Sequence, residues 1–66
     1  MTEQESLMAW LYRRIQHAPD LGTIRFYYLY FKDMWLKEFN TLTNIPAEVY
    51  DQIRMKRESL RRRFNE

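Results

Sequence analysis

The residues with the strongest chemical character are cations near the C-terminus, between Arg54 and Arg63. They are Arg54, Lys56, Arg57, Arg61, Arg62 and Arg63. Guanidinium and ammonium groups bind phosphates, and a protein that neutralises phosphates gains affinity by releasing their counterions. The segment therefore predicts a DNA- or RNA-binding surface as one candidate function. The simpler interpretation is a solvated helix end, whose cations complement the negative end of the helix dipole.

Catalytic and metal-binding chemistry has little support in the sequence. The chain contains one histidine (His17), one glycine (Gly22) and no cysteine. A nucleophile–base pair, a cluster of metal ligands and a glycine-rich phosphate loop each need more than these residues provide. We predict that the protein is not an enzyme and that it has no catalytic residue, no metal site and no cofactor.

A second concentration of distinctive residues is the stretch from Thr23 to Asn40, which holds seven of the eleven aromatic side chains. A strand would show apolar and polar residues in alternation, and this stretch does not. At the helical period, one stripe contains Ile24, Tyr28, Phe31, Trp35 and Phe39. We predict a helix with more apolar surface than a short chain covers alone. The predicted protein interface is Tyr27, Tyr28, Leu29, Tyr30, Phe31, Trp35 and Leu36.

Length and charge limit the remaining choices. A chain of 66 residues forms one domain and buries only about 60% of the surface that its unfolded form exposes. Because no disulfide can compensate, we expect a homodimer formed through the central aromatic helix. Residues 1–53 carry a net charge of −2, and residues 54–66 carry +4. No apolar run is long enough to span a membrane, and the protein is expected in the cytoplasm.

These segments predict an all-α domain of three helices, at residues 3–18, 23–40 and 46–64. Thr2 and Glu5 have the spacing of a capping box, Thr23 is the expected cap of the second helix, and Gly22 is expected to permit a tight reversal. The chain is read as a single domain, 1–66, with residues 54–66 as a basic helical extension. We expect the third helix to pack up to Ile53 and then to project into solvent, although Leu60 and Phe64 continue its apolar stripe.

Thirteen residues, Leu42 to Arg54, read LTNIPAEVYDQIR. This piece resembles the end of the Hha/YmoA family of small nucleoid-associated modulators, which close with a leucine, Ile-Pro, Val and an aromatic, and Ile-Arg. The gap between Leu42 and Ile45 is one residue shorter here, the basic extension is additional, and the family's central helix has no counterpart. The resemblance implies a helical protein that binds a nucleoid-structuring partner and modulates transcription.

The sequence thus favours a small non-enzymatic regulatory protein that binds a protein partner through the aromatic helix. The alternative is a small DNA- or RNA-binding regulator that uses its basic C-terminal helix. The two differ in salt dependence, because phosphate binding weakens steeply as salt rises and apolar contact does not.

Overall fold

The computed structural model describes residues 2–65, with side chains placed for residues 2–63. Three helices account for most of this part of the chain: α1 (Glu3–Gln16), α2 (Leu21–Phe39) and α3 (Ala47–Asn65). The prediction of an all-α, three-helix domain is confirmed. The helix boundaries lie within two residues of the predicted ones, and Phe64 falls outside the described side chains.

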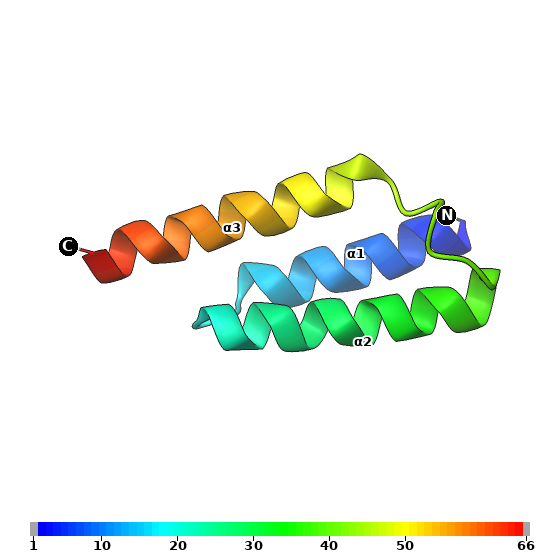
Figure 1. Ribbon diagram of the computed structural model, residues 1–66, viewed down its shortest axis with the longest axis horizontal. Coiled ribbons are helices and arrows are strands. Elements are labelled where there is room, and N and C mark those ends of the chain that lie inside the picture. Colours follow the sequence, from blue (N-terminus) through cyan, green and yellow to red (C-terminus); the bar gives the residue numbers. More distant parts are fainter. Residues whose placement is uncertain (1, 66) are drawn as a thin grey trace.

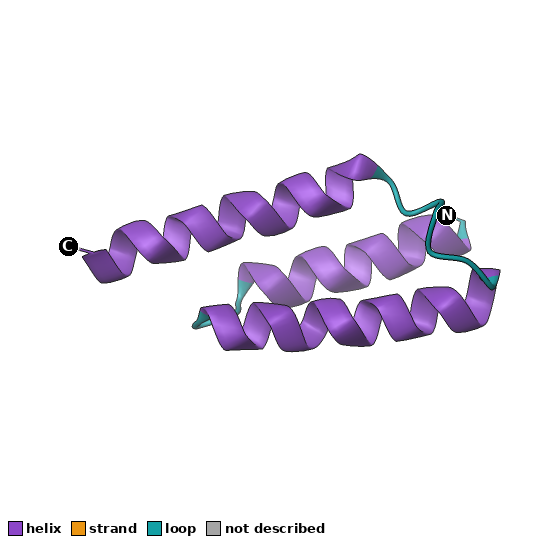
Figure 2. Cartoon of the chain, in the orientation of Figure 1, coloured by secondary structure: helices purple, strands orange, loops and turns teal. Residues whose placement is uncertain are grey.

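The helices form an up-down-up bundle with two short connections (Figures 1 and 2). α1 and α3 run in the same direction and α2 runs against them, so the end of α1, the start of α2 and the second half of α3 lie together. The bundle is elongated, with extents of 41 × 18 × 18 Å. The last turns of α3 extend past the connection between α1 and α2 (Figure 1).

The first two helices begin with side-chain caps. The hydroxyl of Thr2 accepts a hydrogen bond from the backbone N–H of Glu5 at 3.1 Å, as its spacing predicts. The prediction that Thr23 caps the second helix is wrong, because Asp20 accepts from the Thr23 N–H at 2.7 Å. Gly22 does not form the reversal either: it lies inside α2 with a negative φ. An aspartate before the helix satisfies the free N–H groups of the first turn, so α2 begins two residues earlier than expected.

The connection from α2 to α3 is fixed by two different interactions. Asn40 adopts a left-handed conformation (φ 58°) and donates its N–H to the carbonyl of Leu36 at 2.7 Å, which ends α2. Four residues later, the Asn44 side chain accepts a hydrogen bond from the indole N–H of Trp35 at 2.6 Å. The fully buried indole is thereby satisfied, and the connection is held against the end of α2.

The core runs along the inside of all three helices. Its largest fully buried side chains are Leu11, Ile24, Phe31, Trp35, Val49 and Leu60. Phe31, Trp35 and Phe39 follow one another with tilted rings, whose centroids are 5.4 and 4.7 Å apart. Leu60 is only 1% exposed, so α3 packs beyond Ile53, and the expectation that it leaves the bundle there is wrong. Lys56 and Arg57 do not interrupt the packing, because they flank the buried stripe.

Candidate functional site

The fold divides the predicted interface on α2 among three environments. Phe31 and Trp35 are fully buried within the single chain, so they cannot present a surface to a partner. Tyr27 and Tyr30 lie on the side of α2 that meets α1, where both contact the Trp10 ring. Tyr28, Leu29 and Leu36 lie on the side nearer α3 or outward. The exposed part of the predicted interface is therefore divided between two separate faces of α2, one toward α1 and one toward α3.

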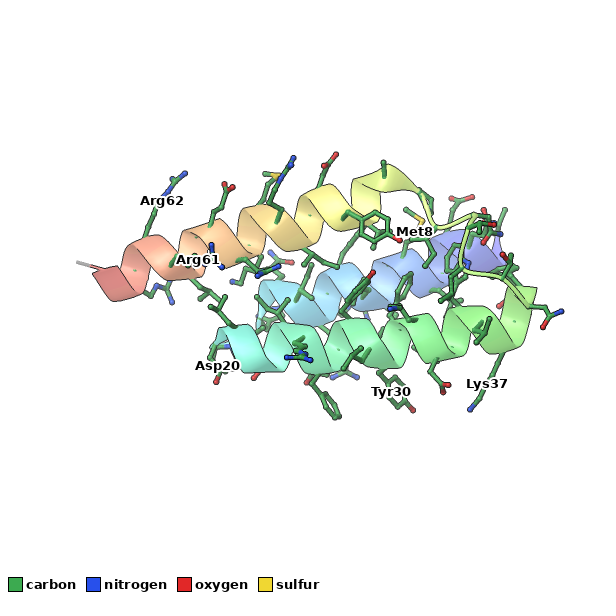
Figure 3. All side chains as sticks on the ribbon, viewed as in Figure 1. Met8, Asp20, Tyr30, Lys37, Arg61 and Arg62 are labelled. Atoms are coloured by element: carbon green, nitrogen blue, oxygen red, sulfur yellow. The ribbon has the colours of Figure 1, made fainter. Side chains whose placement is uncertain are left out.

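The first face, here called the aromatic face, is formed between α1 and α2. Its members are Trp10, Phe26, Tyr27, Tyr30 and Met34, which line a cleft of about 420 Å³ together with Arg14. The ring of Trp10 meets Tyr27 edge-on at 6.1 Å and Tyr30 at 5.7 Å. Phe26 and Tyr30 remain 63% and 53% exposed. Figure 3 shows Tyr30 pointing away from the bundle.

The second face, here called the α2–α3 groove, lies between the first half of α2 and the middle of α3. It has a volume of about 530 Å³ and is lined by Leu21, Gly22, Ile24, Arg25, Tyr28, Ile53 and Arg57. Apolar side chains dominate its lining, and none of these residues is acidic. The two arginines come from different helices and are both exposed. The groove thus joins an apolar lining to positive edges.

Charge is distributed unequally along the bundle. Ring contacts between Trp10 and Tyr27, and between Tyr28 and Tyr50, mark its middle. The half toward the α1–α2 connection, residues 11–27 and 51–65, holds nine of the eleven Lys and Arg residues with three acidic ones, a net charge of +6. The opposite half, residues 2–10 and 28–50, carries −3. We call the first the basic half.

The six predicted phosphate-binding residues are not equivalent in the structure. Arg54 pairs with Asp51 at 3.0 Å, and Lys56 donates to the backbone carbonyl of Gln16 at 2.9 Å. Lys56 therefore caps the end of α1 and joins it to α3. Arg57 and Arg61 are exposed and form no salt bridge with any described residue. Figure 3 shows Arg62 pointing away from the bundle.

The face between α1 and α3 is more polar than the other two. Its lining includes Tyr12, Gln16, Glu48, Gln52 and Lys56. The Tyr12 hydroxyl is buried without a hydrogen-bond partner among the described residues. Burial, followed by the nearby Glu48 carboxylate, raises the pKa of Tyr12. The raised pKa follows from packing, and nothing beside this hydroxyl suggests a reaction.

Three further observations bear on the class of protein. Residues 2–65 contain no group of three or more His, Cys, Asp or Glu side chains arranged to hold a metal ion. Within the described part of the chain, no helix is both long and apolar enough to cross a membrane. Comparison with protein-family models, curated proteins and solved structures gives no match.

Sequence reasoning missed the contributions of Arg13, Arg14 and Arg25 to the basic half. These residues precede the basic segment by about 30 to 40 positions in the sequence. Only the up-down-up topology brings them to the same half of the bundle as residues 54–63 (Figure 1). The short connection between α1 and α2 could have predicted part of this arrangement, because it makes the end of α1 and the start of α2 neighbours.

Proposed function

We propose that this chain is a small regulatory protein that acts by binding other proteins, and that its aromatic face joins two copies into a homodimer. The observation that carries this proposal is the exposure of Phe26 and Tyr30 above the ring cluster around Trp10. Aromatic side chains at the centre of an interface supply much of its binding energy. The lack of cysteine suits the reducing cytoplasm, which is where we place the protein.

Charge supports a second copy as the occupant of the aromatic face. A two-fold axis that passes near Tyr30 and is perpendicular to α2 would place the two α2 helices antiparallel, with the same residues contributed by both copies. In that arrangement the basic half of one copy, at +6, lies beside the half at −3 of the other. Opposite charges then meet at both ends of the interface, while the aromatic rings meet at its centre.

Sedimentation equilibrium over a wide concentration range tests this homodimer. We expect a reversible dimer for the natural chain, and a dimer weakened about 30-fold or more by the double change Phe26→Ser and Tyr30→Ser. The matched control is Leu36→Ser, which makes the same kind of change at an exposed apolar residue outside the aromatic face. A monomer at all concentrations, or dissociation by Leu36→Ser alone, contradicts the proposal.

The basic half favours a second candidate function, namely binding to DNA or RNA. Nine cations from three helices lie in the basic half, whereas the C-terminal segment alone provides six. Such a surface attracts phosphates without reading base sequence. The test is binding to random duplex DNA at about 50 and 200 mM salt. A steep salt dependence that is reduced alike by Arg57→Glu and Arg62→Glu supports this function, and weak or salt-independent binding opposes it.

Removing residues 54–66 would be a poor form of this experiment. The truncation would delete Leu60, which is fully buried, together with the Lys56 contact to Gln16. Loss of binding could then result from unfolding. Single charge changes at exposed arginines leave the core intact and test the surface directly.

A further inference from the structure

We infer that the α2–α3 groove is the docking site for an acidic amphipathic helix of a partner protein. This inference deepens the proposed regulatory function, because it assigns the chemistry of a partner, but it concerns a different face from the homodimer. The groove has the shape, the apolar lining and the sign of charge that such a helix requires.

The shape of the groove follows from how the three helices are connected. A turn of a few residues and the rings around Trp10 hold α1 and α2 together, whereas residues 40–46 separate α2 from α3. The space between α2 and α3 stays open beside Ile24, Tyr28 and Ile53. From Leu21 to Tyr28 the groove follows α2 for about two helical turns, or roughly 10 Å. This length suits the apolar stripe of one short helix.

The lining provides the contacts that such a helix requires. Leu21 and Tyr28 are half-buried, so each retains apolar surface that a partner would cover. Leu29 follows Arg25 by one turn, is 52% exposed and extends the apolar surface along α2. On α3, Tyr50 contacts the Tyr28 ring at 6.2 Å and is 45% exposed. A partner helix whose leucine-rich stripe lies on these side chains would become the fourth helix of the bundle.

The charges beside the groove select an acidic partner. Arg25 on α2 and Arg57 on α3 line it from opposite sides. Lys32 lies over the Tyr28 ring at 5.3 Å and adds a third cation. By helical spacing, Arg61 shares the side of α3 that carries Arg57. Carboxylates on both flanks of a docked helix would meet these cations, and basic flanks would be repelled.

Nucleic acid is the weaker fit to this particular surface. A duplex contacts cations through phosphates and has no use for a lining of leucine, isoleucine and tyrosine. The groove also contains only part of the positive charge, because Arg62 points away from it (Figure 3). A phosphate backbone would be attracted to the whole basic half, including Arg62. The effect of changing Arg62 therefore distinguishes a docked acidic helix from a bound nucleic acid.

The experiment measures binding of a fluorescent helical peptide of about 15 residues, stapled because short helices are marginal in water. It carries a leucine stripe flanked by glutamates, and a second peptide has lysines in place of the glutamates. We expect the acidic peptide to bind and the basic peptide to bind about tenfold or more weakly. Arg57→Glu and Arg25→Glu should each weaken the acidic peptide about tenfold. Arg62→Glu, the charge-matched control, should change its affinity less than twofold.

A second variant blocks the groove without changing its charge. Gly22 lines the groove, and an added Cβ would meet only the Asp20 side chain at 3.5 Å, so the helix accepts a Cβ at this position. Gly22→Leu should weaken the acidic peptide about tenfold while the chain stays folded by circular dichroism, since it fills part of the site. Gly22→Ser is the smaller control.

Several outcomes would overturn the groove as this docking site. They are no binding of the acidic peptide, equal binding of the two peptides, and equal losses from Arg57→Glu and Arg62→Glu. The last result would indicate a general attraction of anions to the basic half. None of these outcomes alters the dimer measurement, and Phe26→Ser with Tyr30→Ser should leave peptide binding unchanged. Failure of the groove and failure of the aromatic face are therefore distinguishable.

Discussion

The aromatic face and the α2–α3 groove both contain residues of α2, but the helix is packed differently at the two surfaces. On the aromatic face, side chains of α1 and α2 contact one another, and the surplus surface of Phe26 and Tyr30 stands outward. In the groove, α2 and α3 leave a hollow whose edges carry guanidinium groups. An exposed aromatic surface suits self-association, and a hollow with one sign of charge suits a segment of opposite sign. We therefore propose that the one amphipathic helix contributes to two surfaces of different specificity.

The largest expected effect comes from the residue that holds α3 in place. Leu60 is 1% exposed, so Leu60→Ala should lower the free energy of unfolding by about 2–5 kcal/mol through lost burial and a cavity. Thermal unfolding followed by circular dichroism measures this, with Met55→Ala at a 60% exposed position as the control. Equal stability of the two variants would show that α3 ends its packing at Ile53. The groove would then lack a fixed second wall.

A smaller loss of stability is expected at Asn44, whose side chain bonds the α2–α3 connection to Trp35. Asn44→Ala removes the acceptor for the buried indole N–H of Trp35, and an unsatisfied buried donor costs about 1–3 kcal/mol. The change should also loosen the placement of α3, so it should weaken the acidic peptide more than the dimer. Urea denaturation gives the stability, and Thr43→Ala in the same connection is the control. An unchanged stability would contradict the role of this hydrogen bond.

The stability of the fold should fall at alkaline pH because of Tyr28, which lines the groove. Burial, followed by the neighbouring Tyr50, raises the pKa of Tyr28 from 10.0 to about 12. Below pH 10 both the folded and the unfolded state hold this proton, so its contribution to stability is complete there. As pH rises from 10 to about 12, the unfolded state loses the proton first and stability falls.

Tyr28→Phe removes this contribution to the pH dependence. The free energy of unfolding of the variant should therefore decline less between pH 10 and 12 than that of the natural chain. Urea titrations at several pH values in this range measure both slopes. Identical slopes would mean that the Tyr28 phenol is as well hydrated in the folded state as in the unfolded one.

The smallest effect on stability is expected at Gly22. This residue follows the α1–α2 connection and can be compared with Asn40, which begins the α2–α3 connection. Gly22 lies in the first turn of α2 with a negative φ, and an added Cβ would make ordinary van der Waals contact with the Asp20 side chain. Gly22→Ala should therefore raise the free energy of unfolding by about 0.4–1 kcal/mol, because the unfolded chain loses freedom. Asn40→Ala is the contrasting change, since that residue has φ 58° and alanine is strained there. Stabilisation by both changes, or by neither, would contradict this account.

Much of the architecture could be predicted from residue order. The helical spacing of apolar residues gave three helices, Thr2 marked the start of the first, and Ile45–Pro46 preceded the third. The caps were less certain, because Asp20 and Thr23 are both good capping residues three positions apart. The interface on α2 was predicted too broadly. Periodicity placed Phe31 and Trp35 on a stripe, and the core of the single chain covers that stripe completely.

The amino-acid sequence by itself determined the helices, the apolar stripes and the excess of aromatic and basic side chains. Tertiary structure alone decided that Arg25 lies across a groove from Arg57, that Leu60 is buried, and that Tyr27 and Tyr28 serve different faces. The reason is physical. Periodicity within one helix states which residues share a side, but which side meets which neighbour depends on the connections and on how the helices pack together.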